Sequence, residues 1–489
     1  MPDLSKPPMA QSYTGSDLCR YEAYEVVEML KKGDVSSSEL LEASYERIAS
    51  VGPSINATPT LCRDRAEAAV ASLDDSNKDH PGWLGGLPIG IKDLDKVSGV
   101  RTTCGTKGLS DFVPEHSDHF VDLLEERGGI IVGKTNTPEM GAGGNTFNDV
   151  LGTTRNPWNT SMNAAGSSGG AAASLAAGET WLSSGSDHGG SLRTPAAFCG
   201  VVGLRPSPER ITKTLVAGTT AGFITEGVLG PMARSVRDCA LFLDAMTGFD
   251  PRSPQSFPTP DTPFQRAVIE ADSKVRIAYS PDLSGLSPVE PVIAEVLQRA
   301  LRQVEQAGGF VEEACPDLSN LEKTYYALRA LGFCTSYLRA PESLTRHFKQ
   351  TIKDNWEFGR SLSLEDIANS NLDRTTLFLN MHDFLQDFDV LACPTVGCMP
   401  RKVELEWVDE INGVKLTNYM DWLRFAFLAT TTGLPAVSVP VGFSDDGMPI
   451  GIQLIGPPRG EAKLLAVARA VELAVGGPIG PIDPNITHV

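Results

Sequence analysis

The sequence has few basic residues, and they do not gather into a cluster. Lys and Arg together number 42 against 61 Asp and Glu, which gives a formal net charge of −19. Binding to a nucleic-acid backbone needs a basic face, so this composition argues against a nucleic-acid partner. The same negative charge disfavours adsorption to an anionic membrane surface.

Long apolar segments are also missing. No stretch of about 18 consecutive apolar residues occurs, so we expect no transmembrane helix. Residues 1–15 contain no apolar segment of the kind found in secretory signals. These two absences together predict a cytoplasmic protein that does not associate with a membrane.

The cysteines are scattered and show no metal-binding spacing. There are nine of them, an odd number, and no CxxC motif occurs. Cys393 and Cys398 are too isolated to predict a zinc site, and His116 and His119 form a two-histidine fragment that lacks a third ligand. We therefore expect reduced thiols, no metal site and no organic cofactor.

No internal repeat, low-complexity segment or domain linker interrupts the 489 residues. The pattern therefore favours one large domain, residues 1–489, over several smaller ones. A variable, mainly helical part is expected at about 285–430, with its helices between about 321 and 386. Short buried strands follow at 390–394 and 435–442, where apolar and β-branched residues dominate.

The most informative stretch is 163–206, which holds two glycine-flanked serine sites. The first site is GSSGG, with Ser167 and Ser168, and the second is GGS, with Ser191. Glycine weakens a helix or strand by about 0.5–1 kcal/mol relative to alanine, so its repeated use indicates a tight bend or a close backbone approach. Residues 171–177 are small helix formers that can pack as a short buried helix. A loop, a helix and a second loop could therefore bring Ser167 and Ser191 face to face.

In order along the chain, GSSGG and GSDHGGSLRTPAAFCGVVGLRP resemble the pattern of the amidase signature family, which is GGSSGG, then GTDxGGSIRxPA, then GLKP. Ala165, Ser186 and Arg205 replace a Gly, a Thr and a Lys of that pattern, and none of these changes removes a reactive side chain. The resemblance extends over about residues 15–475, with the signature core at about 85–245. It implies an α/β fold in which one large mixed β-sheet is covered by α-helices.

The resemblance also implies a catalytic triad. Ser191 takes the place of the nucleophile, and Ser167 that of the bridging serine, which has a cis peptide on its amino side. Lys92 stands in the family's G-x-P-x-x-x-K-D motif as the base. The implied oxyanion hole consists of the backbone N–H groups of His188, Gly189, Gly190 and Ser191. The implied border of the substrate's acyl side consists of Gly141, Ala142, Gly143 and Gly144, for which a plain flexible turn is the alternative interpretation.

The lysine also makes physical sense as a base, although an edge-strand lysine that reaches water is the alternative on pattern alone. A free lysine has a pKa of about 10.4, so only about one in a thousand is neutral near pH 7.5. Burial disfavours the ammonium form and can lower the pKa by several units. Lys92 lies in the apolar segment LPIGIK. A neutral Lys92 could take a proton from Ser167 while Ser167 takes one from Ser191.

Two rival motifs compete with this interpretation. GSSGG also satisfies the GxSxG elbow of α/β-hydrolases with Ser168 as the nucleophile, but the preceding residues 156–165 are turn-like instead of a strand. That fold would also need a histidine near the C-terminus, where the chain offers His488. The string GGIIVGKT at 128–135 matches a phosphate-loop pattern, but it reads as a buried strand instead of a loop that follows one.

We therefore predict an amidase that cleaves a C–N bond of a carboxylic amide or anilide, or of a carbamate (urethane), through a Ser191 acyl-enzyme. Three alternatives stay open: an esterase of the α/β-hydrolase type, a subunit that supplies ammonia to charged tRNA, and a non-enzymatic binding protein on a hydrolase scaffold. The acidic composition disfavours the tRNA-linked alternative. The expected partners are a small amide or carbamate substrate and, at most, a second copy of the chain in a homodimer.

Overall fold

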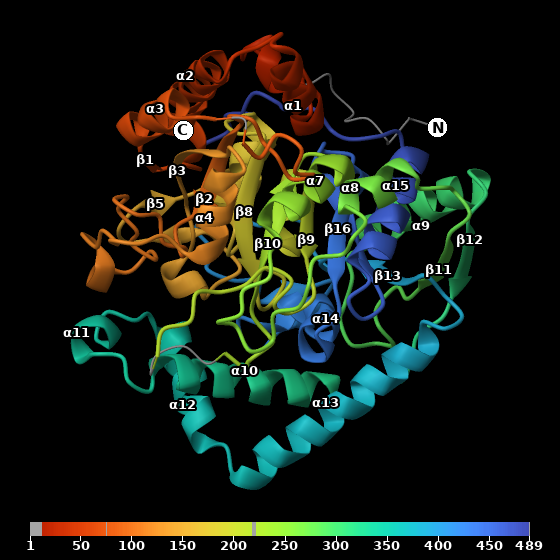
Figure 1. Cartoon of the computed structure of the whole chain (residues 1–489). Coiled ribbons are helices and arrows are strands. Elements are labelled where there is room, and N and C mark those ends of the chain that lie inside the picture. The colour runs from red at the N-terminus through yellow and green to blue at the C-terminus, as the bar shows by residue number, and fades with distance from the viewer. Residues whose placement is uncertain (1–11, 75, 218–221, 489) are drawn as a thin grey trace.

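The computed structural model describes residues 12–74, 76–217 and 222–488. Its centre is an 11-stranded β-sheet with the strand order β1-β3-β2-β8-β10-β9-β16-β17-β13-β11-β12 (Figure 1). The strands of this sheet are β1 (Thr60–Leu61), β2 (Pro88–Lys92), β3 (Ile130–Thr135), β8 (Leu182–Asp187), β9 (Val202–Arg205), β10 (Val228–Ala233), β11 (Arg276–Tyr279), β12 (Phe310–Glu313), β13 (Val390–Pro394), β16 (Ala436–Phe443) and β17 (Pro449–Ile455). Short two-stranded ladders are formed by β4 (Phe147–Asn148) with β5 (Gly152–Thr153), β6 (Arg155–Asn156) with β7 (Asn159–Asn163), and β14 (Glu410–Ile411) with β15 (Val414–Lys415).

Parallel and antiparallel pairs are both present in the central sheet. β2 runs parallel to both β3 and β8, and β11 runs parallel to both β12 and β13. The middle of the sheet, from β8 through β10, β9, β16 and β17 to β13, is antiparallel. The predicted α/β fold with one large mixed sheet is therefore confirmed.

Helices cover both faces of this sheet. α5 and α6 pack with the C-terminal part of α2 in one apolar cluster. α7, α9 and α15 belong to a second, larger cluster, which also contains most of the buried apolar side chains of the central strands. The α-helices are α1 (Ala23–Lys32), α2 (Ser37–Ile55), α3 (Arg63–Ala71), α4 (His119–Glu126), α5 (Gly169–Ala177), α6 (Arg193–Cys199), α7 (Val236–Met246), α8 (Phe264–Ile269), α9 (Pro291–Gln306), α10 (Leu321–Tyr337), α11 (Glu342–Thr345), α12 (Gln350–Ser361), α13 (Leu364–Phe384), α14 (Phe427–Thr432) and α15 (Glu461–Ala474). Short 3₁₀ helices span Asp17–Arg20, Lys107–Leu109, Glu139–Gly141 and Asp421–Ala426.

The helix between the two serine sites forms as its composition predicts. Every residue of α5 is buried, and its small side chains allow the helix to lie close to β8 and β2. The helix ends at Gly178, which has a left-handed φ of 77° that glycine adopts without a steric penalty. Burial of this helix fixes the two serine loops to the same rigid core.

The part at about 285–430 is not wholly helical. α10, α12 and α13 lie together along one end of the molecule, below the sheet in Figure 1, as the sequence predicts. The strand predicted at 390–394 is confirmed as β13, which lies between β17 and β11 in the central sheet, whereas β12, which pairs with β11, was not predicted. Short apolar strands such as β13 carry little periodic signal, so their place in the sheet depends on tertiary pairing.

In the portion of the chain that the structure describes, no helix combines the length and apolar character needed to cross a bilayer. Within those same residues, no group of three or more His, Cys, Asp or Glu is placed to hold a metal ion.

Candidate active site

Three segments that are distant in the sequence meet beside the end of β2. Lys92 is the last residue of β2, Ser167 lies in the loop that leads into α5, and Ser191 lies in the loop between β8 and α6. β2 pairs with β8, with Gly90 opposite Ser183, so the lysine and the second serine loop are held on neighbouring strands. The sheet register therefore brings the sequence-predicted residues into one site.

Lys92 is fully buried and is surrounded by serine hydroxyls. Its Nζ lies 2.7 Å from Oγ of Ser167, 2.8 Å from Oγ of Ser168 and 3.0 Å from Oγ of Ser186. No carboxylate of the described residues lies within ion-pair distance of this amine. The edge-strand alternative, in which the lysine tip reaches water, is therefore wrong for this residue.

Burial lowers the pKa of Lys92 to about 7, although the charges of Asp95 and Asp187 oppose the shift. A neutral amine is a proton acceptor, whereas an ammonium group is not, so the shift makes Lys92 a base near neutral pH. Burial also raises the pKa of Asp95, which weakens the opposing negative charge. The electrostatics are thus those expected for a lysine that accepts protons from a hydroxyl.

Ser167 and Ser191 both line a cavity of about 330 Å³. The peptide bond between Gly166 and Ser167 is cis, as the family resemblance implies. The two loops are tied together by a hydrogen bond of 3.2 Å in which the backbone N–H of Ser168 donates to the carbonyl of Ser191. Both serine residues therefore border the same space, with Lys92 behind Ser167.

Ser168 is placed differently from an elbow nucleophile. It is fully buried at the N-terminal end of α5 and is not among the residues that line the cavity. The strand before it, β7, pairs with β6, forms one isolated bridge from Met162 to Lys402, and is not part of the central sheet. His488 shares a hydrogen bond of 2.7 Å with Thr160 instead of approaching Ser168. The α/β-hydrolase arrangement is therefore absent from the residues that the structure describes.

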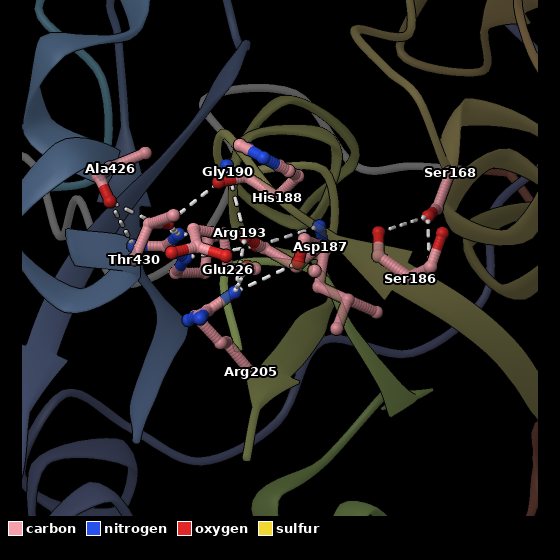
Figure 2. A network of polar contacts seen from close by, with 12 residues as sticks. Ser168, Ser186, Asp187, His188, Gly190, Arg193, Arg205, Glu226, Ala426 and Thr430 are labelled. Carbon is pink, nitrogen blue, oxygen red and sulfur yellow. Dashed lines mark hydrogen bonds and ion pairs between the residues drawn. The ribbon is translucent and has the colours of Figure 1, made fainter. Parts of the chain in front are cut away.

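A buried carboxylate organises the backbone before the second serine. Asp187, the last residue of β8, accepts hydrogen bonds from Nη2 of Arg193 at 2.8 Å and from Nε of the same side chain at 3.0 Å. Nη1 of Arg205 donates to the Asp187 carbonyl at 2.8 Å, and the same group reaches the Glu226 carbonyl. Figure 2 shows these groups gathered below His188 and Gly190. Arg193 and Arg205, which belong to the signature, thus hold the loop in place through Asp187 and do not line the cavity.

The same carboxylate also binds two backbone N–H groups of the loop. Gly190 donates to Oδ1 and Leu192 to Oδ2 of Asp187, each at 3.1 Å. Burial alone would raise the pKa of Asp187, but Arg193 and Arg205 outweigh it and hold that pKa well below its usual range. Of the four N–H groups assigned to an oxyanion hole, that of Gly190 is therefore already engaged, so we keep that assignment for His188, Gly189 and Ser191.

Gly190 is the one position of this loop where glycine is required by the backbone. Its φ of +93° is strained for any residue with a side chain. A Cβ atom there would also lie 2.8 Å from Oγ1 of Thr194 and 3.0 Å from Cβ of Ala426. The tight loop therefore depends on the absence of a side chain at this residue.

We predict that Asp187→Asn lowers the free energy of unfolding by about 3–5 kcal/mol, because it leaves two buried cations without their carboxylate. The amide NH2 would also face N–H donors that need an acceptor. The expected readout is an earlier midpoint in urea unfolding together with a loss of turnover, since the loop that carries Ser191 loses its anchor.

Asp149→Asn is the matched control for this substitution. Asp149 pairs with Lys107 at 2.7 Å, but its side chain is 75% exposed, so the change should cost less than about 1 kcal/mol. Folding lowers the pKa of the Asp187 carboxyl group. The contribution of this carboxylate to the free energy of unfolding is therefore complete above the unfolded pKa of about 4, and it is lost as the pH falls from there through the lower folded pKa. An equal cost for both substitutions at neutral pH would contradict the prediction.

The glycine-rich loop after β3 contributes less to the cavity than expected. Gly141 lines it together with Met140, whereas Ala142, Gly143 and Gly144 are not among its lining residues. Ala142 is buried against Phe348 and Ile352. The predicted substrate-binding border is therefore reduced to Gly141 at its near end.

Several site residues were not identified from the sequence. The His188 ring lines the cavity, and Asp95, Asp187 and Lys213 line it as well. Burial, followed by the nearby arginines, lowers the pKa of His188 well below its ordinary value, so the ring is neutral. Asp187 stood within the signature and could have been singled out there. Lys213 stands outside the motifs, so its place in the cavity carried no sequence signal.

The sequence matches a known protein family and known relatives over most of its length. The Amidase family model matches residues 39–465. An acylamidase of Rhodococcus erythropolis is 34% identical over 467 residues, which cover 94% of this chain and 96% of that protein. A glutamyl-tRNA(Gln) amidotransferase subunit of Thermosynechococcus vestitus (strain NIES-2133 / IAM M-273 / BP-1) is also 34% identical, and the match covers 92% of this chain and 96% of that protein.

Solved structures are similar over nearly the whole chain. A bacterial aryl acylamidase of the amidase signature family matches with a TM-score of 0.85 and 28% identity, covering 95% of this chain and 100% of that one. The 6-aminohexanoate cyclic dimer hydrolase complexed with substrate matches with a TM-score of 0.83 and 28% identity, covering 94% and 98%. The chain therefore belongs to the amidase signature family, and it is a hydrolase that acts on carbon–nitrogen bonds other than peptide bonds.

Proposed function

We propose that this enzyme hydrolyses small carboxylic amides or anilides, and carbamates as a second substrate type, through a covalent acyl-enzyme on Ser191. The observation that carries the proposal is the contact of a buried, low-pKa Lys92 with Ser167 at the wall of the cavity that Ser191 also lines. The names of the acylamidase relatives support an amide as the substrate. No cofactor takes part in the proposed chemistry.

In the first step, Ser191 Oγ attacks the substrate carbonyl carbon. Its proton moves to Oγ of Ser167, and the proton of Ser167 moves to Nζ of Lys92, which becomes an ammonium group. The developing oxyanion accepts hydrogen bonds from backbone N–H groups in the His188–Ser191 loop. Donors of this kind contribute about 2.7–4 kcal/mol each to transition-state stabilisation.

In the second step, the C–N bond breaks and the leaving nitrogen takes a proton from Ser167, which Lys92 resupplies. The amine departs and Ser191 remains acylated. Water then attacks the acyl carbonyl, its proton follows the same route, and Ser191 is released in its original state. A carbamate presents the same carbonyl and C–N bond to Ser191, so it fits the same steps and releases carbonic acid derivatives instead of a carboxylic acid.

The test is a panel of acyl-matched aliphatic amides, anilides, carbamates and esters, measured as kcat/KM on the wild type and on Lys92→Ala. An alkyl amine cannot leave as an anion, so it depends most on the returned proton, whereas an ester depends least. We expect the variant to lose the most activity on alkyl amides, less on activated anilides and the least on esters.

Equal fractional losses across the panel would remove the proton-return step from the mechanism. Glutamine is added to the panel and measured on the wild type, as a test of the alternative functions. Ammonia release from glutamine in preference to all anilides would favour the amidotransferase-like alternative, which the relatives at similar identity keep open. No turnover of any member and no labelling by a serine-directed phosphonate would favour a binding protein.

A further inference from the structure

The cavity that Ser191 lines continues into a second cavity, and the charged residues in the described lining of this second cavity are basic. This outer cavity has a volume of about 320 Å³. It adjoins the inner one, because both are lined by Met140, Gly141, His188, Lys213 and Gly227. The inner cavity also has Asp95, Asp118 and Asp187 in its wall, whereas the described residues that line the outer cavity include no Asp or Glu.

Two cations line this outer cavity instead. Arg329, on α10, is 5% exposed and lines its wall. Lys213 lies at the junction of the two cavities, and burial lowers the pKa of its ammonium group. No carboxylate of the described residues lies within ion-pair distance of either group. Lys213 donates to the Gly227 carbonyl, and the charges of Glu209, Glu226 and Asp95 act on it from beyond ion-pair distance and oppose the effect of burial on its pKa. Arg329 thus has no counter-ion within ion-pair distance in the described part of the protein.

The hydrogen-bond partners of Arg329 among the described residues are neutral groups. Its Nη2 donates to the Tyr419 hydroxyl at 2.7 Å, its Nε donates to Oδ1 of Asn355 at 3.2 Å, and its Nη1 lies 3.2 Å from Nδ1 of His188. A buried guanidinium with neutral partners keeps most of its desolvation cost, which a bound anion would offset. Arginine suits a carboxylate in particular, because its planar N–H groups match the two oxygens.

His188 adds a third donor next to Arg329. A guanidinium can only donate, so Nδ1 of His188 must accept from Arg329, and the proton of the neutral ring lies on Nε2. The ring lines both cavities. Lys213 and His188 thus line both cavities, whereas Arg329 lines the outer one.

We propose that the substrates of this enzyme are amides that carry a carboxylate, and that Lys213, His188 and Arg329 bind this carboxylate in the outer cavity. The inference rests on the proposed amide hydrolysis and specifies its substrate class. Phe333 and Tyr337 line the same space and offer apolar surface to the chain that joins the carboxylate to the amide.

The test uses two pairs of substrates that differ only in charge. In the first pair, glutaryl 4-nitroanilide is compared with the methyl ketone in which an acetyl group replaces its carboxylate. In the second pair, the charge lies on the amine side, and acetylated 4-aminobenzoate is compared with acetylated 4-aminoacetophenone. We expect the acid to exceed its ketone in kcat/KM by about tenfold or more in at least one pair.

Substitutions then locate the source of the preference. Arg329→Met and Lys213→Met should each bring the acid-to-ketone ratio toward one, and Arg329→Lys should keep more of the preference than Arg329→Met. Arg424→Met is the matched control. Arg424 contacts Glu322 at 2.8 Å, and Glu322 lies on α10, the helix that also carries Arg329. Arg424 itself is not a lining residue of either cavity. The control should retain the wild-type ratio.

Binding without turnover provides an independent measurement. Glutarate should bind to Ser191→Ala in calorimetry, and Arg329→Met in that background should weaken its binding by about tenfold or more. Cleavage of neutral anilides with an acid-to-ketone ratio near one in both pairs would overturn this inference and leave the proposed function intact. No glutarate binding, or an unchanged ratio in both cation variants, would also overturn the inference. Failure to cleave any amide would overturn the proposed function instead.

Discussion

Ser191→Ala should lower kcat by about 10⁴–10⁶-fold and leave the urea unfolding midpoint unchanged, since removal of a nucleophile in a catalytic triad has an effect of this size. The residue is half-buried at the cavity wall, and its hydroxyl contributes little to packing. Turnover and unfolding are measured on the same preparations. A serine-directed phosphonate should add its mass to Ser191 in the wild type and to no residue in the variant.

Ser174→Ala is the matched control for the loss of a serine hydroxyl. Ser174 is buried in α5, where its Oγ donates to the Ala171 carbonyl at 2.9 Å, and it does not line the cavity. Turnover by this variant should stay close to that of the wild type. Phosphonate on Ser168 instead of Ser191 would contradict the prediction and restore the elbow interpretation.

Lys92→Met should lower kcat by about 10²–10⁴-fold, the usual contribution of a general base. Since the pKa of folded Lys92 is lowered to about 7 and the neutral amine is the active form, wild-type kcat/KM should rise as the pH increases through about 7 and level off above it. This limb should be absent in Lys92→Met. The measurement is a pH profile of kcat/KM with an activated anilide.

Lys134→Met provides a control with the opposite outcome. Lys134 is an equally buried lysine on the neighbouring strand β3, but its Nζ lies 3.4 Å from Oδ1 of Asp93. Loss of this cation leaves Asp93 buried without a cationic partner and should cost about 3–5 kcal/mol of stability, with the pH limb retained. Lys92 has hydroxyl partners among the described residues, so its removal should not lower stability in the same way.

The double variant Lys92→Met with Ser167→Ala should be scarcely slower than either single variant. Residues that act as one proton relay lose their function together, so their effects do not add. Additive losses would indicate that Lys92 and Ser167 act separately. A limb near pH 6.5 that persists without Lys92 and disappears with a histidine substitution would identify a histidine as the base.

Much of the site could be predicted because its residues lie in ordered local motifs. The glycine pattern around Ser167 and Ser191, the small residues of α5 and the apolar strand that ends in Lys92 each have a local physical meaning, namely a tight loop, a buried helix and desolvation. In the structure Lys92 contacts Ser167, Ser167 and Ser191 line the same cavity, and the string GGIIVGKT forms the buried strand β3 and the two glycines before it. Local composition was sufficient here because each motif is contiguous.

The tertiary structure alone decided which groups share the cavity. Lys213 and Arg329 come from segments without a motif, and their meeting beside His188 depends on how α10 packs across the end of the sheet. The strand β13 likewise joins the sheet through pairing with β11 and β17, which short apolar runs do not specify. The sequence by itself thus determined the family, the mixed α/β fold and the candidate reacting residues, because these depend on contiguous patterns. The charge and shape of the substrate cavity depended on long-range packing, because distant side chains acquire a common environment only when the chain is folded.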